Sequence, residues 1–418
     1  MANSLLTINM ITNEALMLFR NSNAFIQTVD KQYDASFAKN GAKIGTTLRI
    51  RLPNDPVTRS GATANPQSIT ERNTTLTITN QDGVDLQFSS EDLALSMDTF
   101  SERVLAPSIN NLGGLVAKNV MSMVEQIPNI VHATDVNNNT ISPTQQTWLN
   151  AGALLDNFSV PRGQRTAVLS PYTSATTVGS MLNLFNPGGQ ISKQFKAGSM
   201  NNQTEVLGIQ DWRVDQTVIL HQAGSYNQNA VANVAAGGIS NSANGPYNGS
   251  VVATTATSGN LNIGDIISFT GVYAVNRVTK ASTGQLAQFA VTAPVANGAT
   301  SISVYPAVIG PDVNGNAVQY QTVVAVPATN TVITSPINGN ESYSKNFTFV
   351  KEAFTLATAD LFLPTGAVIA ADRKVFDGIS MRAITDYLPL TDQQFTRFDV
   401  LYGWTAPRPE WAVAIASK

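Results

Sequence analysis

Side chains that could hold a metal ion are scarce in this sequence. It has two histidines, His132 and His221, and no cysteine in 418 residues. Ordinary zinc sites take most of their ligands from cysteine and histidine, so here carboxylates would have to supply most of them. We therefore expect no metal site at either histidine. The lack of cysteine also excludes disulfides and cysteine nucleophiles.

One acidic stretch, residues 312–316, has the spacing with which a calcium-binding loop begins. An EF-hand loop would continue with a glycine and end on a glutamate, but Ala317 and Val323 occupy those two positions. The pair Asn314 and Gly315 is instead a strong signal for a tight turn between two strands. The stretch therefore predicts a β-hairpin turn.

No common catalytic motif is present. The sequence contains no GxSxG, no phosphate-binding GxxxxGK[ST] and no GxGxxG at a helix start. Serine hydrolases need a histidine base, and two histidines leave little room for one. Carboxylate pairs such as Glu91 and Asp92 are typical of solvated helix starts. A glycosidase built on two carboxylates stays open but nothing favours it, so we expect no enzyme activity, no catalytic residue and no cofactor.

The composition is poor in charge. Charged residues make up 13% of the chain and hydrophobic residues 43%, whereas an average soluble domain has about 25% charged residues. Such a surface repels its own copies weakly, which favours self-association. The formal net charge is -3 and no segment carries a run of Lys or Arg, so we expect no tight binding to nucleic acid.

Length and hydropathy indicate a multidomain protein outside the membrane. The N-terminal residues lack a basic stretch ahead of an apolar one, and the sequence nowhere has the 18 or so consecutive apolar residues of a spanning helix. We therefore expect neither a secretion signal nor a membrane span. Single cores stop growing near ~250 to 300 residues, so two or three domains are expected.

The first eighty residues predict an arm with one helix, followed by a long hairpin. Apolar residues from Ile8 to Phe19 recur at steps of three and four, as in a helix with one apolar face. Residues 46–52 alternate polar and apolar as a half-buried strand does, and residues 75–79 form a second such strand. The polar segment 53–72 between them is too long for a tight turn. An isolated two-stranded ribbon is marginal in water, so we expect this one to lie on another surface.

A long helix is predicted between residues 98 and 126, where apolar residues keep helical spacing until Pro128 ends the pattern. Pro107 and the pair Gly113 and Gly114 would weaken an isolated helix, the glycines by ~1 kcal/mol each. We therefore expect neighbouring segments to pack against this helix and hold it.

From about residue 221 to residue 342 the sequence turns to Ala, Val, Thr, Asn and Gly with almost no charge. Short alternating segments there predict an all-β module inserted into a mixed host domain. Its predicted strands are 266–269, 288–292, 301–305 and 321–326. The host is expected to contain strands at 166–170, 347–350 and 396–402, with a turn or short helix at 353–358.

Four stretches resemble one known family. They are GTTLRIRLP at 45–53, SERVLAPSINNLGGLVAKNV at 101–120, NFTFVKEAFTLATADLFLP at 346–364 and FDVLYGWTAPRPE at 398–410. With the order of the elements, they are similar to the major capsid proteins of tailed phages, specifically the coat proteins of Salmonella-type short-tailed phages that carry an inserted domain. Residues 264–272, GDIISFTGV, are similar to the start of that inserted domain.

The resemblance implies an α+β fold of the Hong Kong 97-like capsid type with an inserted all-β domain. The implied parts are an N-terminal arm at 1–41, an extended hairpin (E-loop) at 42–80, a P-domain with the long spine helix at 81–130, the first part of the A-domain at 131–220, the inserted β-rich domain at 221–342, and the completion of the A- and P-domains at 343–418.

The same resemblance implies a structural function. Many copies would assemble as hexamers and pentamers into the icosahedral head shell of the virion, around double-stranded DNA that is not bound specifically. Scaffolding protein and portal are the implied partners, with a decoration protein left open and no membrane involved. Assembly would start as a procapsid in the host bacterial cytoplasm, and the procapsid would expand on maturation. The insertion is implied to aid subunit folding and procapsid contacts.

Candidate contacts between subunits lie on the predicted hairpin. They are the charged side chains Arg49, Arg51, Arg59, Glu71 and Arg72, which could pair with opposite charges of a neighbour; simple solvation is the alternative. Two other function classes stay open. A β-rich surface adhesin or carbohydrate-binding protein would need a secretion signal and repeats, and a β-rich hydrolase would need a clustered acid and base.

Overall fold

The computed structural model describes residues 8–22, 24–34, 47–59, 62, 66–67, 72–89, 101–181, 206–226, 230–232, 239–241, 249–364, 368–388 and 393–418. The chain forms two compact units, each assembled from separate stretches of sequence. The first combines Met1–Arg49, Thr75–Met121 and Phe354–Thr405, and the second Ile50–Thr74, Ser122–Ala353 and Ala406–Lys418. Both units contain helices and strands, which confirms the predicted α+β class.

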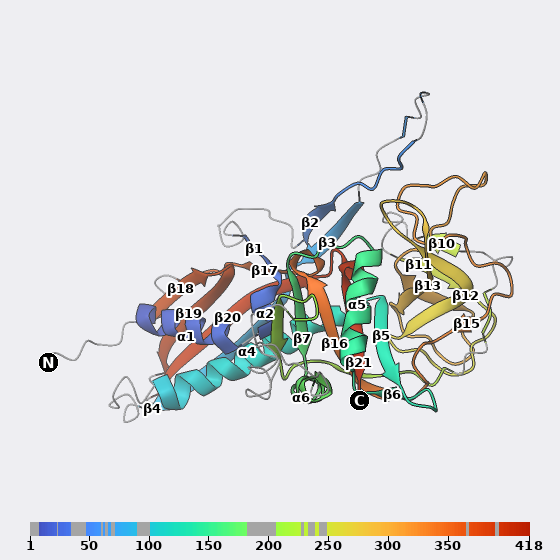
Figure 1. Ribbon diagram of the computed structural model, residues 1–418. Coiled ribbons are helices and arrows are strands. Elements are labelled where there is room, and N and C mark those ends of the chain that lie inside the picture. The colour runs from blue at the N-terminus through green and yellow to red at the C-terminus, as the bar shows by residue number, and fades with distance from the viewer. Residues whose placement is uncertain are drawn as a thin grey trace. The chain divides into compact units, whose positions relative to one another are not determined.

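The first unit is a six-stranded sheet with helices packed against it. Five strands follow the order β1 (Asp30–Asp34), β17 (Thr355–Ala359), β20 (Gln393–Thr405), β19 (Ile379–Leu388) and β18 (Ala370–Phe376), and β4 (Asn80–Ser89) also pairs with β20. Helix α1 (Ile8–Ser22) lies along β18 and β19 and contacts α4 (Ala106–Met121) (Figure 1). A short α2 (Ala24–Thr28) follows α1. The helix predicted in the arm is thereby confirmed.

The long helix is also confirmed within the described residues. A π-helical turn (Ser101–Leu105) leads into α4, and a 3-10 helix (Ser122–Gln126) follows it, so helical structure ends two residues before Pro128. Residues 98–100 lie outside the described residues. The predicted apolar stripe is buried, with Ile109 and Val120 both at 0% exposure. The expected packing is supplied by α1 and the strands of this unit.

One predicted element of this unit is wrong. Residues 353–358 were expected to form a turn or short helix, but a 3-10 turn (Lys351–Ala353) is followed at once by strand β17. All five residues of β17 are buried. The strand runs parallel to β1 and antiparallel to β20, so pairing on both sides decides its conformation over the weak local preference of Ala and Thr.

The second unit holds two sheets. The order in the first is β6 (Thr140–Ile141), β5 (Asn129–Thr134), β21 (Ala412–Ser417), β16 (Ser342–Val350), β7 (Arg165–Leu169) and β8 (Asp211–Val214), and β9 (Leu220–Gln222) also pairs with β16. Helix α5 (Gln145–Asn157) covers β5 and β21 (Figure 1). Its Trp148 packs edge-to-face on Trp212, with ring centroids 4.9 Å apart. Helix α6 (Pro171–Ser180) follows β7 and is capped by the Ser170 hydroxyl.

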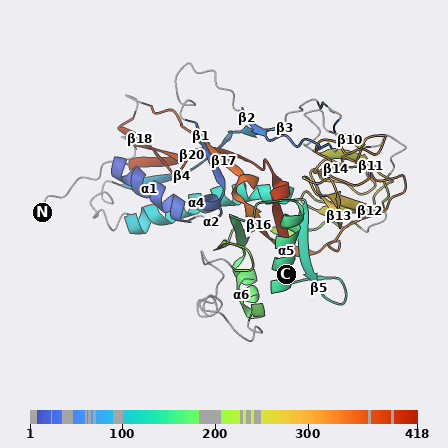
Figure 2. The ribbon, with the colours of Figure 1, turned by 45° about the horizontal axis from the view of Figure 1, so that its top comes forward.

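The second sheet lies entirely within the predicted insertion. Its order is β10 (Ile239–Asn241), β11 (Ser250–Ala253), β14 (Ser301–Tyr305), β13 (Ser282–Val291), β12 (Ile266–Val275) and β15 (Ile333–Thr334), with every pair antiparallel (Figure 2). It has its own core, in which Phe269 and Phe289 pack edge-to-face. The strands that flank the module, β9 and β16, pair with each other through His221 and Tyr343. The chain therefore leaves and rejoins the host sheet at one place.

The strand predicted at residues 321–326 is wrong. Only an isolated bridge between Ala274 and Val323 forms there. The amides of Thr322 and Val323 donate to Ile309, whereas that of Val324 donates to Tyr273. The alternating pattern marks inward-facing side chains, but its backbone partners belong to two different segments, so no continuous ladder can form.

Strands β2 (Thr47–Leu52) and β3 (Arg72–Thr77) form a two-stranded sheet, which confirms the predicted hairpin. Its second strand was predicted at residues 75–79, but it begins three residues earlier and ends at Thr77. Strand β2 is more exposed than a half-buried strand, because its first three residues are all exposed. Of the segment between the strands, residues 53–59, 62 and 66–67 are described. Among these residues, the Gln67 side chain joins the two sides of the hairpin. Its amide oxygen accepts the backbone N–H of Val57, and its amide nitrogen donates to the carbonyl of Val57.

Candidate functional site

The predicted contact residues fall into different environments. Arg49, Arg51 and Arg59 are exposed, as side chains that meet a neighbouring subunit would be in a single chain. Glu71 lies outside the described residues. Arg72, the first residue of β3, is buried at 6% exposure. The four described arginines therefore do not form one surface cluster, and their role between subunits stays a prediction.

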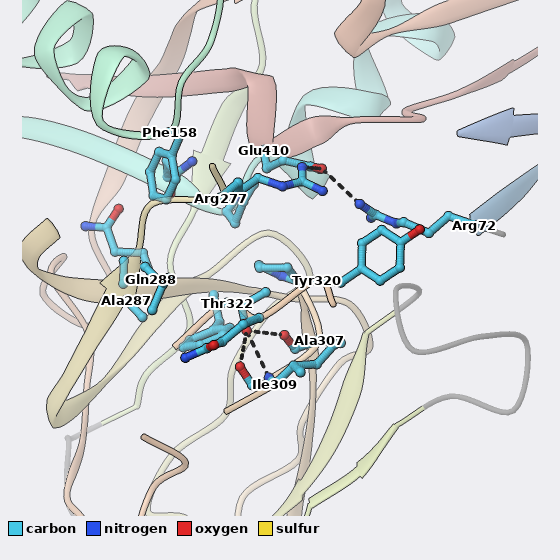
Figure 3. Close-up of a pocket in the computed structure, with 17 residues that line it drawn as sticks. Arg72, Phe158, Arg277, Ala287, Gln288, Ala307, Ile309, Tyr320, Thr322 and Glu410 are labelled. Atoms are coloured by element: carbon cyan, nitrogen blue, oxygen red, sulfur yellow. Dashed lines mark hydrogen bonds and ion pairs between the residues drawn. The ribbon is translucent and has the colours of Figure 1, made fainter. Parts of the chain in front are cut away.

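Arg72 makes its described contacts within the chain. Its Nη1 lies 3.7 Å from Oε1 of Glu410, and its guanidinium stands 5.3 Å from the centre of the Tyr320 ring (Figure 3). A guanidinium at this distance from an aromatic face is attracted by the ring quadrupole. The start of β3 is thus attached both to the C-terminal segment and to the insertion.

Glu410 is the centre of this cluster. Arg277 Nη1 lies 2.6 Å from Oε1, and the Tyr305 hydroxyl donates to Oε2 at 2.6 Å. Burial alone would raise the pKa of Glu410, but the charges of Arg277 and Arg72 and the bond from Tyr305 outweigh it and lower the pKa to about 2. Glu410 is therefore an ionised carboxylate inside the protein.

A second ion pair continues the cluster towards the hairpin. Asp55 Oδ2 lies 3.0 Å from Lys280 Nζ and 3.4 Å from Arg277 Nε. The neighbouring Asn54 accepts a hydrogen bond of 2.7 Å from the Tyr320 hydroxyl. We call the set Asp55, Arg72, Arg277, Lys280 and Glu410 the hairpin base. It binds both ends of the hairpin to the insertion of the same chain.

The hairpin base borders a small cavity of ≈ 60 Å³ (Figure 3). This is far below the roughly 300 Å³ at which ordinary ligand pockets begin. A larger pocket of ≈ 490 Å³ adjoins it and shares Asn129, Phe158, Ala274 and Gln288 with it. The lining of this larger pocket consists of aliphatic, aromatic and amide side chains and contains no titratable group. Neither space combines an acid, a base and a nucleophile, so the geometry is that of a structural junction.

The suspected calcium loop is a turn. Asp312 Oδ1 accepts the backbone N–H groups of Asn314 and Asn316, at 2.9 and 2.7 Å, and Gly315 has a φ of 79°. The carboxylate is thus used by its own loop. No strand flanks the turn, so the prediction of a hairpin was wrong in that respect. Among the described residues, no group of three His, Cys, Asp or Glu side chains could hold a metal ion.

The two histidines have different surroundings. His132, on β5, has a pKa lowered by burial. His221, on β9, is buried between the carboxylates of Glu125 and Asp265.

None of the helices in the described part of the chain is long and apolar enough to cross a membrane.

Sequence reasoning missed most of the hairpin base. It selected Arg72 but not Asp55, Arg277, Lys280 or Glu410. One signal was available: Arg277 and Lys280 are the only Lys or Arg residues between positions 221 and 342. In so uncharged a segment, cations that stand three residues apart point to a specific ionic contact.

Comparison with known families gives the identity of the fold. The family described as P22 coat protein, gene protein 5, matches residues 1–415. The chain belongs to the P22 coat protein family. It is therefore a bacteriophage coat protein and a component of the virion, and its α+β fold is of the Hong Kong 97-like capsid type, as the sequence resemblance implied.

The solved structures that match this chain are distant in sequence. The capsid of Ralstonia phage GP4 is 6% identical with a TM-score of 0.45, over 93% of this chain and 86% of that one. The capsid of cyanophage P-SCSP1u is 10% identical with a TM-score of 0.44, over 95% and 88%. A virus-like particle from Pyrococcus furiosus is 6% identical with a TM-score of 0.39, over 97% of both. No curated protein matches the chain.

Proposed function

We propose that this coat protein assembles in many copies, as hexamers and pentamers, into the icosahedral head shell of a tailed phage. The family match over residues 1–415 carries the proposal. The low charged fraction of 13% supports it, because copies with so few charges repel one another weakly. A net charge of -3 suits a shell that encloses double-stranded DNA without binding it specifically.

The proposal includes the course of assembly. The shell forms first as a procapsid around scaffolding protein, together with a portal, in the host bacterial cytoplasm, and it expands on maturation. The phage is of the Salmonella-type short-tailed kind, and a decoration protein is a further candidate partner. The four quoted sequence stretches and the paired strands β9 and β16 at the limits of the insertion support this assignment.

We assign the parts of the chain as the resemblance implied. Residues 1–41 are the arm, 42–80 the E-loop, 81–130 the P-domain with its spine helix, and 221–342 the insertion; the A-domain takes 131–220 and is completed with the P-domain by 343–418. The pairing of β2 with β3 and the separate core of the insertion support these limits.

The exposed arginines of the hairpin are the proposed contacts with neighbouring subunits. Arg49, Arg51 and Arg59 offer charge on a surface where little other charge is available. Glu71 and Arg72 complete the set, and Arg72 has a double role because its contact with Glu410 fixes one end of the hairpin.

Expression of the chain with and without the scaffolding protein of the same genome tests the proposal. Electron microscopy and size-exclusion chromatography should show closed shells of uniform diameter when scaffolding protein is present. Shells formed equally well without it would contradict the scaffold step alone. A chain that stays monomeric under both conditions would contradict the capsid function and favour the adhesin.

A further inference from the structure

A second ionic cluster lies where the insertion joins its host. Its members are Glu125 on the 3-10 helix after α4, His221 on β9, Asp265 directly before β12, and Lys345 on β16. We call these four residues the insertion base. Lys345 is 0% exposed and His221 is 4% exposed. Because β9 and β16 carry the chain into and out of the insertion, this cluster stands at its point of attachment.

The contacts of the cluster form a continuous chain. Lys345 Nζ lies 3.0 Å from Glu125 Oε2 and donates to the carbonyl of Gly264 at 3.0 Å. His221 Nδ1 lies 3.0 Å from Glu125 Oε2. On the other side of the ring, Nε2 lies 2.9 Å from Asp265 Oδ1. One imidazole therefore bridges a carboxylate of the host to a carboxylate of the insertion.

This geometry selects one protonation state of His221. An ionised carboxylate can only accept hydrogen bonds, so a ring with a carboxylate at each nitrogen needs a proton on both nitrogens. In that state two carboxylates face two cations and the buried cluster is electrically neutral. Loss of one proton breaks one of the two bonds and leaves an excess negative charge inside the protein, which is costly.

The two carboxylates favour the protonated ring against two opposing effects. Burial tends to lower the pKa of His221 and the charge of Lys345 lowers it further, but the bonds to Asp265 and Glu125 outweigh both, so the pKa is raised above 6.5. Burial likewise tends to raise the pKa of Glu125, but Lys345 and His221 lower it to about 2. A further ionisable neighbour, Tyr343, has its ring centre 5.2 Å from that of His221 and a pKa raised by burial well above 10, to which the nearby Glu341 also contributes. It stays neutral throughout.

Asp265 connects His221 to the backbone of the insertion. Its second oxygen, Oδ2, accepts the backbone N–H groups of Gly224 and Asn262, at 3.0 and 2.7 Å. The turn that precedes β12 and the segment that follows β9 are thus both fixed by the carboxylate that His221 holds in place.

We propose that the insertion base is a pH-sensitive latch. With the His221 ring doubly protonated, the insertion is bound to the 3-10 helix Ser122–Gln126 through Glu125. When the ring loses a proton, one of its two hydrogen bonds is lost and the insertion is held less tightly at this point. The latch is a property of one chain and does not depend on assembly, so a failure of the shell proposal would leave it untouched.

Linkage gives the direction and size of the effect. Between pH 6.5 and the higher pKa of the folded state, the latched form binds one more proton than the open form. Opening therefore becomes up to about tenfold more favourable for each pH unit in this window. Below pH 6.5 both forms are protonated, and the latch is fully closed.

Nuclear magnetic resonance on the unassembled full chain with ¹⁵N-histidine tests the protonation state directly. The sequence has only two histidines, and His132→Gln assigns the two sets of signals. The two ring nitrogens of His221 should both carry a proton on the acid side of a titration midpoint that lies above 6.5. A midpoint at or below 6.5 would overturn the proposal.

Hydrogen exchange at the Gly224 and Asn262 amides tests the mechanical consequence. After correction for intrinsic rates, their opening should increase by up to about tenfold per pH unit in the same window. His221→Gln should abolish that slope, and the control His132→Gln should keep it. A flat wild type, or a slope that survives in His221→Gln, would refute the latch.

A second variant, Glu125→Gln, keeps the proposal testable if His221→Gln does not fold. Glu125→Gln keeps the shape of the side chain but removes one of the two charges that hold the proton. The titration midpoint of His221 should fall, because the bond and the charge of Glu125 both raise it. An unchanged midpoint would show that the bridge to Glu125 has no influence on the ring.

Discussion

Replacement of Glu410 by glutamine would show whether charge holds the hairpin base together. The variant keeps the shape of the side chain but removes the charge that Arg277 contacts at 2.6 Å and Arg72 at 3.7 Å. The drop in the pKa of Glu410 from 4.5 to about 2 corresponds to about 3 kcal/mol of stabilisation. The side chain is 11% exposed, so solvent screens little of it. We expect the free energy of unfolding to fall by about 3 kcal/mol at pH 7.

The pH dependence of this loss has a defined sign. A carboxyl group with a lowered pKa stabilises the fold above its unfolded pKa, and that contribution disappears as the pH falls through the folded pKa. For Glu410 the window runs from 4.5 down to about 2. The difference in stability between wild type and variant should therefore be constant from pH 7 to pH 5 and shrink below 4.5.

Urea unfolding of the unassembled chain, followed by tryptophan fluorescence, measures the difference. Glu352→Gln makes the same chemical change at an exposed site and should cost less than about 0.5 kcal/mol. Glu125 titrates in the same acid range, but it is common to both proteins and cancels. A loss below about 1 kcal/mol in Glu410→Gln, or an equal loss at pH 7 and pH 3, would refute the reasoning.

Three further substitutions separate the roles of the parts. Gly264→Ala would place a Cβ 1.8 Å from Glu125 Oε2. The control Gly271→Ala meets no neighbouring atom and costs only the backbone strain of ~1–2 kcal/mol. The free energy of unfolding of Gly264→Ala should therefore fall by at least about 2 kcal/mol more than that of the control. Phe289→Ala should destabilise the core of the insertion by ~3–5 kcal/mol in urea unfolding; a loss under 1 kcal/mol would mean that this core is not close-packed. Arg51→Glu, at an exposed site, should leave unfolding within about 0.5 kcal/mol but reduce the yield of shells in electron micrographs, and normal shells would remove Arg51 from the proposed contacts.

Elements with a strong local pattern could be predicted from the sequence. The helical spacing that ends before Pro128 fixed the long helix because each of its buried residues faces one side of the helix. The strand at 166–170 was found for a similar reason: the short apolar run Ala167–Leu169 in β7 is followed by Ser170 and Pro171, which end the strand. Strand β17 was missed because its Ala and Thr residues carry no strong pattern, and pairing with β1 and β20 decides its state.

Contacts between distant positions could not be predicted in this way. Arg277 and Glu410 are 133 residues apart, and His221 is 96 residues from Glu125. No periodicity or spacing rule connects such positions, because the fold alone brings them together. The type of residue still carried a signal, since a charged side chain in an uncharged segment needs a partner if it is buried.

The few charges of the insertion are concentrated on its attachment to the rest of the second unit. Residues 222–342 contain five charged side chains, namely Asp265, Arg277, Lys280, Asp312 and Glu341. Asp265, Arg277 and Lys280 belong to the hairpin base or the insertion base, and Glu341 binds the Thr140 backbone with its carboxylate. Only Asp312 serves a turn of the insertion itself.

This distribution has a physical consequence. A buried ion pair adds little net stability compared with well-packed apolar side chains, but removal of one partner is costly, so such pairs define position more than they add affinity. The apolar core around Phe269 and Phe289 folds the insertion. The ionic clusters instead fix where it attaches and, through His221, make that attachment depend on pH. An all-apolar junction would hold as tightly but could not respond.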